Sequence, residues 1–319
     1  MTRRTPFAAL LLLALALAAH GALVAAPKKD SERHRFGVIG HSFHNGSSGE
    51  AKLKQAIADE SEAALAFVVV TGIKGGDEPC SDSLYEKRRA LFDDARRPMI
   101  VALSASDWSA CKNSAGRSVA IDRLNRLREL FFNEPSSLGV HQLPLTRLSA
   151  SAKFRSYAEN AHWQIGDVLY ATINLPANNN HYRAEAGRNS EFEDRLVANR
   201  FWLNRLFAMA RREKLGALVL FSEGDVKALA QPSGLRALLG RSNSFDGFDE
   251  PRRQIATLAQ KYAGKVLLID TDAARKSAGP VIEWRGNLGH VSVGSEAVEV
   301  QVTPGASPPF TLKNAADEK

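Results

Sequence analysis

The segment AFVVVTGIKGG, residues 66–76, is a β-branched apolar run that ends in a glycine-rich stretch. A short apolar run bounded by turn residues is typical of a buried strand. On either side of it, 49–63 and 82–95 carry apolar residues at three- and four-residue spacing, which is typical of amphipathic helices. FGVIG at 36–40 and MIVAL at 99–103 are two further buried-strand runs. The chain therefore begins as a βαβ arrangement.

The same alternation continues toward the C-terminus, with three more apolar runs and three more stretches of helical period. The strands are expected at 168–174, 217–221 and 265–269, and the helices at 117–132, 190–213 and 249–263. Because strand and helix alternate, the sequence predicts an α/β fold built in layers.

After Pro280 the pattern changes to a period of two. The runs VIEW, LGHVSV and VEVQVT alternate apolar with polar residues and are separated by glycine or turn residues. This pattern predicts an antiparallel meander. A chain that begins as βαβ and ends in such strands can form two sheets packed face to face, with helices outside.

The N-terminal 26 residues have the features of a secretory signal peptide. Arg3 and Arg4 precede an apolar run from Phe7 to Ala19, which small residues follow. The alternative is a membrane anchor, but about 13 apolar residues fall short of the roughly 20 that a spanning helix needs. We therefore expect a signal peptide at 1–26, one domain at 27–312 and a disordered tail at 313–319. The expected location is periplasmic or secreted, with no membrane span after cleavage.

The charge of the expected mature chain argues against nucleic acid as a partner. Removing Arg3 and Arg4 from 42 basic residues leaves 40 against 35 acidic ones, a net charge of +5 with histidine neutral. Lysine and arginine are scattered among aspartate and glutamate, without a basic run or an aromatic ladder.

Cys80 and Cys111 are the two cysteines of the chain. An exported chain matures in an oxidising compartment, so the sequence predicts a disulfide between them. The alternatives are a metal-binding thiolate pair and two free buried thiols.

Several short motifs occur in a characteristic order along the chain. They are IKGG at 73–76, PCSDSLY at 79–85, RLRELFF at 126–132, PSSLG at 135–139, EN at 159–160 before Trp163, NLPANNN at 174–180 and GNL at 286–288. Together they resemble the exported bacterial members of the calcineurin-like metallophosphoesterases, and the resemblance covers nearly the whole mature chain. It implies a four-layer αββα sandwich of the metallophosphoesterase type, with two mixed sheets flanked by helices.

The resemblance fails at the positions that would hold metal ions. Members of that family hold two divalent cations at strand ends, where carboxylate, amide and imidazole ligands compensate the charge and a hydroxide nucleophile forms. Their Gly-Asp pairs, Gly-Asp-Asn-Glu-Trp and His-Gly-Asp-x-His are substituted here. The degenerate positions are His41, Gly72, Ser106, Asp107, Asp270 and Ala274.

Gly72 stands where the resemblance implies the carboxylate that bridges the two metals. Without it two like charges would repel each other strongly, so we expect no dinuclear site and no cofactor. A single-metal site is the alternative, with ligands drawn from His41, His44, Asp270 and Asp272 and with manganese, iron or zinc as the metal. These four residues fit equally well as solvated loop residues. The sequence predicts structural roles for the lone histidines His162, His181 and His290.

Other hydrolytic motifs do not occur in the sequence, which has no GxSxG and no Walker-type glycine loop. Lys74 with Gly75 and Gly76 could cradle a phosphate, although Gly-Gly-Asp after a strand favours a turn. The amides of Asn178, Asn179 and Asn180 suit sugar or phosphate oxygens, and suit equally a loop that binds its own backbone.

Two functions follow from these observations. The first is an exported, catalytically inactive metallophosphoesterase-like protein retained as a ligand- or partner-binding module for a small phosphate-containing or carbohydrate ligand. The second is an active phosphoester hydrolase with a mononuclear or rearranged metal site. The second rests on the resemblance alone. A shared fold does not by itself establish a function.

Overall fold

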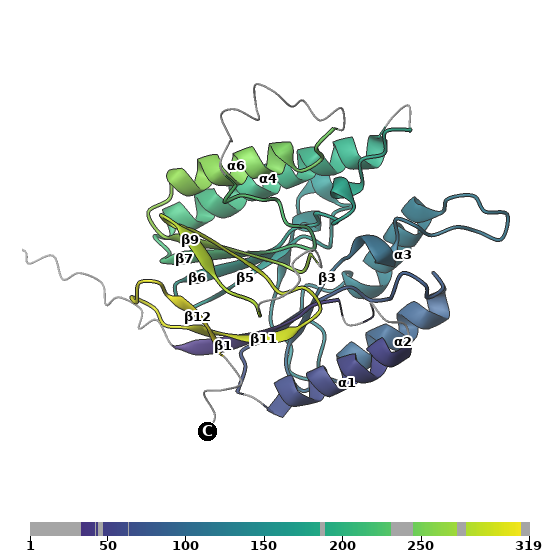
Figure 1. Ribbon diagram of the computed structural model, residues 1–319, viewed down its shortest axis with the longest axis horizontal. Helices are drawn as coiled ribbons and strands as arrows, with labels where there is room; N and C mark the ends of the chain where they lie inside the picture. The colour runs from purple at the N-terminus through teal and green to yellow at the C-terminus, as the bar shows by residue number, and fades with distance from the viewer. Residues whose placement is uncertain are drawn as a thin grey trace, which may run out of the picture. The chain divides into compact units, whose positions relative to one another are not determined.

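The computed structural model describes residues 33–41, 43, 47–62, 64–185, 189–230, 245–272 and 279–313 (Figure 1). Three predicted features lie outside these residues: the signal peptide at 1–26, His44 and Ala274. The last strand ends at Lys313, the first residue of the predicted tail, and the rest of that tail also lies outside the described residues.

The helices of the described residues are α1 (Ser47–Glu62), α2 (Asp82–Asp93), α3 (Ala120–Phe131), α4 (Ser190–Arg212) and α6 (Asp249–Gln260), with short 3₁₀ turns at Ala105–Asp107, Leu148–Ala150, Ala152–Phe154 and Asn179–His181. The strands are β1 (His34–Ile39), β2 (Val68–Thr71), β3 (Met99–Ala102), β4 (Thr146–Arg147), β5 (Ala161–Ile165), β6 (Val168–Thr172), β7 (Ala217–Phe221), β8 (Lys265–Asp270), β9 (Glu283–Arg285), β10 (Leu288–Ser292), β11 (Ala297–Val302) and β12 (Phe310–Lys313).

The strands form two mixed sheets, which confirms the predicted α/β fold at this level. The first sheet has the order β12-β11-β1-β2-β3, and β1, β2 and β3 run parallel. The second has the order β4-β5-β6-β7-β8-β10-β9, and β6, β7, β8 and β10 run parallel. In each sheet the parallel strands end at a common edge, so the loops that follow them are brought together.

Strand β2 shows why these sheets are buried on both faces. Val69 packs in the cluster between the two sheets, whereas Val68 and Val70 pack in the cluster under helices α1 to α3. Side chains alternate between the faces of a strand, so a run of valines supplies both cores. Each fully buried valine contributes roughly 1.5–3 kcal/mol relative to an exposed one.

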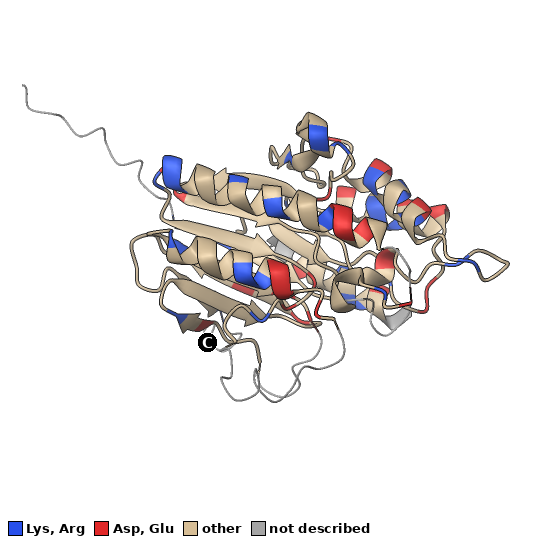
Figure 2. Cartoon of the chain, turned by 90° about the horizontal axis from the view of Figure 1, so that it is seen from above, with Lys and Arg blue, Asp and Glu red and all other residues tan. Residues whose placement is uncertain are grey.

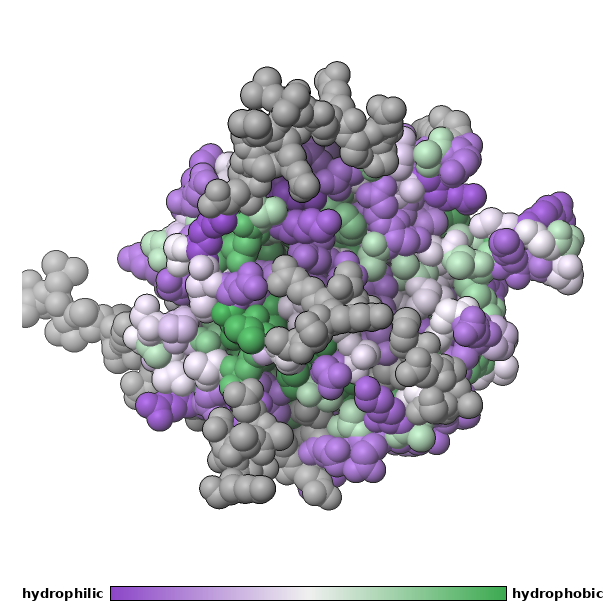
Figure 3. All heavy atoms as spheres, in the orientation of Figure 1, coloured by the Kyte–Doolittle hydropathy of each residue, from purple (hydrophilic) through white to green (hydrophobic). Residues whose placement is uncertain are grey.

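Aromatic side chains fill the space between the two sheets. Phe36 and Phe67 of the first sheet stack at 5.1 Å between ring centroids, and Phe67 meets Trp163 of the second sheet edge to face at 5.1 Å. Helices α4 and α6 cover the outer face of the second sheet, and α1 and α2 lie outside the first (Figure 1). Figure 3 shows hydrophobic residues reaching the surface among polar ones on the side where β9 and β12 lie.

The prediction of a single C-terminal meander is wrong. β9 and β10 form an antiparallel hairpin, but β10 runs parallel to β8 in the second sheet, and β11 pairs with β1 in the first. The chain crosses between the sheets at a turn that contains Gly294, whose φ of 63° favours glycine. An alternation of period two indicates a half-buried strand and does not identify its neighbour.

Two strands were not anticipated, because β4 and β5 precede the predicted strand at 168–174. β5 is an antiparallel neighbour of β6, and β4 extends that sheet by a two-residue pairing. No helix among the described residues is long and apolar enough to span a membrane. Figure 2 shows lysine and arginine interspersed with aspartate and glutamate along the helices.

Candidate functional site

A cavity of about 300 Å³ lies where the carboxyl ends of the parallel strands of both sheets meet. The loops after β1, β2, β3, β6, β7 and β8 all contribute to it. Its lining consists of His41, Phe43, Thr71, Gly72, Lys74, Gly75, Gly76, Ala105, Ser106, Ala177, Asn178, Glu223 and Asp272. Of the predicted site residues, His41, Gly72, Lys74, Ser106, Asn178 and Asp272 are thus brought together. The edge outside the carboxyl ends of parallel strands is where open α/β sheets bind ligands.

Lys74 is the lysine of the cavity lining, and its residue surface is 3% exposed. Its Nζ donates a hydrogen bond to the carbonyl oxygen of Gly75 at 2.6 Å. Burial is the largest influence on this group and lowers its pKa, although nearby carboxylates, chiefly Asp107, act in the opposite direction. The cavity thus has a buried amine in its wall.

Glycines at 75 and 76 meet different needs. A Cβ on Gly75 would lie 2.4 Å from the carbonyl oxygen of Phe43, so only glycine permits this close approach. The amide of Glu78 donates to the carbonyl of Gly75, which shows the turn that the Gly-Gly-Asp sequence predicts. A Cβ on Gly76 would meet no atom within 4 Å, so this position faces open space.

Both carboxylate oxygens of Asp107 accept hydrogen bonds from backbone amides. Its Oδ1 accepts from the amides of Ile73 and Lys74 at 2.7 and 3.1 Å, and its Oδ2 accepts from the amide of Ser104 at 2.7 Å. Burial raises the pKa of this carboxyl, and the three amides lower it. Asp107 therefore joins the loop after β2 to the loop after β3.

Gly72 follows β2 with a φ of 86°, a left-handed conformation that side chains rarely adopt. A Cβ placed there would lie 3.2 Å from Ser104 Oγ and 3.5 Å from His41 Nδ1. The backbone and its neighbours therefore both oppose a carboxylate at this position.

Glu223 was not among the predicted site residues. Of the carboxyl groups that line the cavity, it has the most strongly shifted pKa. Its Oε2 accepts from the amides of Ala105 and Ala177 at 2.6 and 2.8 Å, and its Oε1 lies 3.3 Å from His41 Nε2. Burial raises its pKa to about 8, against the effect of the two amides. It lies two residues after the buried strand 217–221, a position at which an acidic residue could have been recognised.

The raised pKa of Glu223 predicts a pH-dependent stability. Its folded pKa of about 8 lies above the usual glutamate value of 4.5, so between these values the native state binds more protons than the unfolded state. Stability is then retained at low pH and lost as pH rises toward 8. Relative to Glu223→Gln, we expect the wild type to lose about 1 kcal/mol between pH 6 and 7, below the limit of 1.4 kcal/mol per unit.

Urea unfolding of both proteins at several pH values from 5 to 8 measures this difference. The exposed Glu193→Gln on α4 serves as the control, because it should leave the pH profile unchanged. Parallel profiles for the wild type and Glu223→Gln would contradict the prediction.

Asp270 and His290 form a buried pair outside the lining of the cavity. His290 Nε2 contacts Asp270 Oδ2 and lies 3.5 Å from Asp225 Oδ1, so His290 is not the lone histidine that the sequence suggested. Asp270 Oδ1 accepts from Ser292 Oγ at 2.8 Å and from the amide of Asp272 at 3.0 Å. Burial raises the pKa of Asp270, and the contact with His290 lowers it.

One atom from each of Asp225, Asp270 and His290 lies within 4.8 Å of the other two, the spacing of a metal-ligand set. Two of the ligands predicted from the sequence for a single-metal site have different partners in the structure. His41 contacts Glu223, whereas Asp270 contacts His290.

The three consecutive asparagines have different roles. Asn178 lines the cavity and donates to Ser109 Oγ at 3.1 Å. Asn179 and Asn180 point elsewhere: Asn179 binds the backbone of Phe245 and Gly247, and the buried Asn180 donates to the carbonyl of Gly247. The interpretation as a loop that binds backbone thus describes two of the three.

A buried polar network supports the second-sheet side of the cavity. Arg128 of α3 donates to both carboxylate oxygens of Glu159 at 2.7 and 2.9 Å, and Asn174 Nδ2 donates to the same carboxylate at 3.0 Å. Asn160 Oδ1 accepts from the backbone amide of Asn174, and Asn199 Nδ2 donates to the backbone carbonyl of Asn174. The motifs around 126–132, 159–160 and 174–180 therefore meet in one place.

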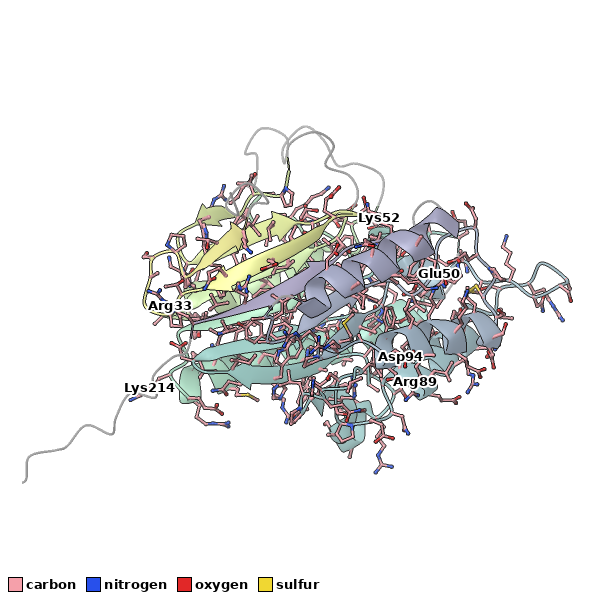
Figure 4. All side chains as sticks on the ribbon, turned by 90° about the horizontal axis from the view of Figure 1, so that it is seen from below. Arg33, Glu50, Lys52, Arg89, Asp94 and Lys214 are labelled. Carbon is pink, nitrogen blue, oxygen red and sulfur yellow. A yellow bond between two sulfur atoms is a disulfide. The ribbon has the colours of Figure 1, made fainter. Side chains whose placement is uncertain are left out.

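Two further devices hold the loop that carries Lys74. The buried Arg88 binds the carbonyl of Ile73 at 3.2 Å, Glu78 at 2.7 Å and Glu50 of α1, which Figure 4 labels. The disulfide between Cys80 and Cys111, with Cα atoms 5.9 Å apart, confirms the predicted pairing and joins the segments after the two cavity loops.

The described residues do not fit a pair of metal ions in the cavity. Gly72 offers no ligand, the oxygens of Asp107 are engaged by backbone amides, and Asp270 is paired with His290. The carboxylates that remain, Glu223 and Asp272, do not form a three-ligand group with His41 in the part of the chain that the structure describes.

Comparisons with known proteins are sparse. No protein-family model matches the chain, and no curated protein matches it. A solved structure of GAP50, the anchor in the inner membrane complex of Plasmodium, is similar at 11% sequence identity and a TM-score of 0.45. The similarity covers 88% of this chain and 84% of that one. At this TM-score the likeness supports no statement about function.

Proposed function

We propose that this chain is an exported, metallophosphoesterase-like protein without metal-dependent catalysis, which binds a small ligand in the cavity at the strand ends. The proposal includes the finer fold assignment, in which helices α1 to α3, the two sheets, and helices α4 and α6 are the four layers of a metallophosphoesterase-type sandwich. The motif order along the chain and the placement of the cores support that assignment.

The conformation of Gly72 is the observation that best supports the proposed loss of metal-dependent catalysis. Two-metal hydrolysis needs a carboxylate shared by both ions, because the ions must be charge-compensated while they hold the nucleophile. A glycine with φ of 86°, placed against Ser104 Oγ and His41 Nδ1, cannot be replaced by such a side chain without strain. What remains is a cavity of 300 Å³, the lower end of the range for small-molecule sites, with polar groups from both sheets.

Elemental analysis and hydrolysis assays on the same preparation test this proposal. The full chain is expressed in medium supplemented with manganese, iron and zinc, and bound metal is measured per chain. We expect sub-stoichiometric metal, no chelator-sensitive cleavage of nitrophenyl phosphate mono- or diesters, and ligand binding that a chelator does not change. Two metals per chain with chelator-sensitive hydrolysis would overturn it.

A mononuclear hydrolase is the second candidate, and the group of Asp225, Asp270 and His290 favours it. Two carboxylates and an imidazole could hold one manganese, iron or zinc ion, which would act as a Lewis acid and lower the pKa of a bound water. One metal per chain, together with hydrolysis that is lost in Asp225→Asn and retained in His41→Gln, would favour this candidate.

A further inference from the structure

Lys74 is a buried lysine without an ion-pair partner among the described residues. Among the described residues no carboxylate oxygen lies within 4.0 Å of its Nζ, and the hydrogen bond to Gly75 satisfies one of the three N–H donors. Of the three carboxylates that act on its charge, Asp107 accepts three backbone amides, and Glu78 binds Arg88 and the amide of Gly75. The third, Asp77, is exposed and forms no ion pair with Lys74 within 4.0 Å. A buried ammonium without a counter-charge is costly.

The position of Lys74 in the cavity lining matters as much as its burial. Lys74 forms part of the cavity wall together with Gly76, whose Cα faces open space, and with Ser106. Lys74 is therefore one of the residues that a ligand in the cavity would contact. His41 adds a second nitrogen-bearing side chain to the same lining, 3.3 Å from the buried Glu223.

The acidic groups of the lining limit what the remainder of the ligand can be. Asp272 and Asn178 also border the cavity. A carboxylate disfavours a second anion beside it but accepts hydrogen bonds from hydroxyl groups, and an amide both donates and accepts. A ligand with one anionic end and several hydroxyls fits this distribution better than a polyanion or an apolar molecule.

We propose that the cavity binds a small phosphate monoester of a polyol or sugar, with its phosphoryl oxygens on the ammonium of Lys74 and its hydroxyls toward Asp272 and Asn178. This inference rests on the proposed binding function and specifies its ligand class. Phosphate is the natural partner of a lysine that acts as a point charge. Ligand binding also supplies the counter-charge that the buried amine lacks.

Titration calorimetry on the full-length mature protein tests the ligand class, with glycerol phosphate, inorganic phosphate, glycerol and glucose as probes. We expect glycerol phosphate to bind more tightly than inorganic phosphate, and glycerol not to bind. Lys74→Met should weaken binding of the monoester at least about tenfold, a loss of 1.4 kcal/mol. Without ligand, the same variant should melt at a higher temperature than the wild type, because it removes a buried charge.

A second variant avoids any change in the core. Asn178→Asp is isosteric, lies at an exposed position on the cavity rim and adds a negative charge, so it should also weaken binding of the monoester. Two controls match these charge changes elsewhere. Lys112→Met, at an exposed loop position, and Asn204→Asp, on the exposed side of α4, should bind like the wild type.

Three outcomes separate this inference from the proposed function. Unchanged phosphate-ester binding in both Lys74→Met and Asn178→Asp overturns the inference. Binding of glucose that both variants retain also overturns it, while leaving a ligand-binding module in place. If none of the probes binds at millimolar concentration, the inference fails and the proposed function loses its support from the cavity.

Discussion

Arg128→Met is expected to lower the free energy of unfolding by about 3–5 kcal/mol. The side chain of Glu159 is 2% exposed, and Arg128 donates to both of its oxygens from the neighbouring helix α3. Burial alone would raise the pKa of Glu159, but the charge of Arg128 and its hydrogen bonds lower it overall, so the carboxylate is ionised in the folded protein. Without Arg128 a buried negative charge would have only the amide of Asn174 as a side-chain donor.

Thermal unfolding measures this loss, which corresponds to roughly 6–10 °C for a chain of this size. The control is Arg126→Met on the same helix, where the arginine forms exposed ion pairs with Asp82 and Glu86. Exposed ion pairs contribute little to stability, so this variant should melt close to the wild type. Equal melting temperatures for the two variants would show that burial does not distinguish the two arginines.

The same pair of arginines illustrates what a sequence can and cannot predict. RLRELFF at 126–132 identifies a helix, because its apolar residues recur at three- and four-residue spacing. It does not show that Arg128 faces a buried glutamate while Arg126 faces solvent, since Glu159 lies 31 residues further along the chain. Ion pairs between distant segments depend on packing that no local pattern encodes.

Strand prediction succeeded where burial on both faces leaves a continuous apolar run. Val68 to Val70 and 217–221 are such runs, and both are central strands. Assignment to a sheet failed for 297–302, because its alternation is satisfied equally by either sheet. β5 was missed because AHWQI at 161–165 mixes polar with aromatic residues, and its pairing with β6 stabilises it.

The candidate site shows a similar division. Residues within three positions after predicted strands, such as His41, Gly72 and Asp272, could be placed at the cavity because parallel strands end at one edge. The partners of these residues could not be assigned. Asp270 pairs with His290 because β8 and β10 are neighbours, and that neighbourhood depends on the crossing between sheets that the sequence did not indicate.

Removal of the disulfide, in the double variant Cys80→Ala/Cys111→Ala, is expected to cost about 3–4 kcal/mol. The two cysteines are 31 residues apart, and closing a loop of that length restricts the unfolded chain by this amount in the chain-entropy model. Alanine retains part of the packing, and Cys111 is buried, so a small additional loss from the cavity left by its sulfur is included in the upper value.

Urea unfolding of the double variant and of the wild type, each with and without reductant, isolates the cross-link. We expect the wild type in reductant to approach the double variant, and the double variant itself to ignore reductant. The midpoint should fall and the denaturant slope should rise, because an uncrosslinked unfolded chain exposes more surface. A double variant as stable as the wild type would contradict the prediction.

The cavity itself should survive this loss. Asp107 still joins the loops after β2 and β3 through three backbone amides, and Arg88 still holds the loop that carries Lys74. Binding of glycerol phosphate, measured below the unfolding transition, is therefore expected to change less than about threefold, which is under 0.7 kcal/mol. Stability and binding respond to different contacts here, because the disulfide acts mainly on the unfolded chain and Asp107 acts on the folded one.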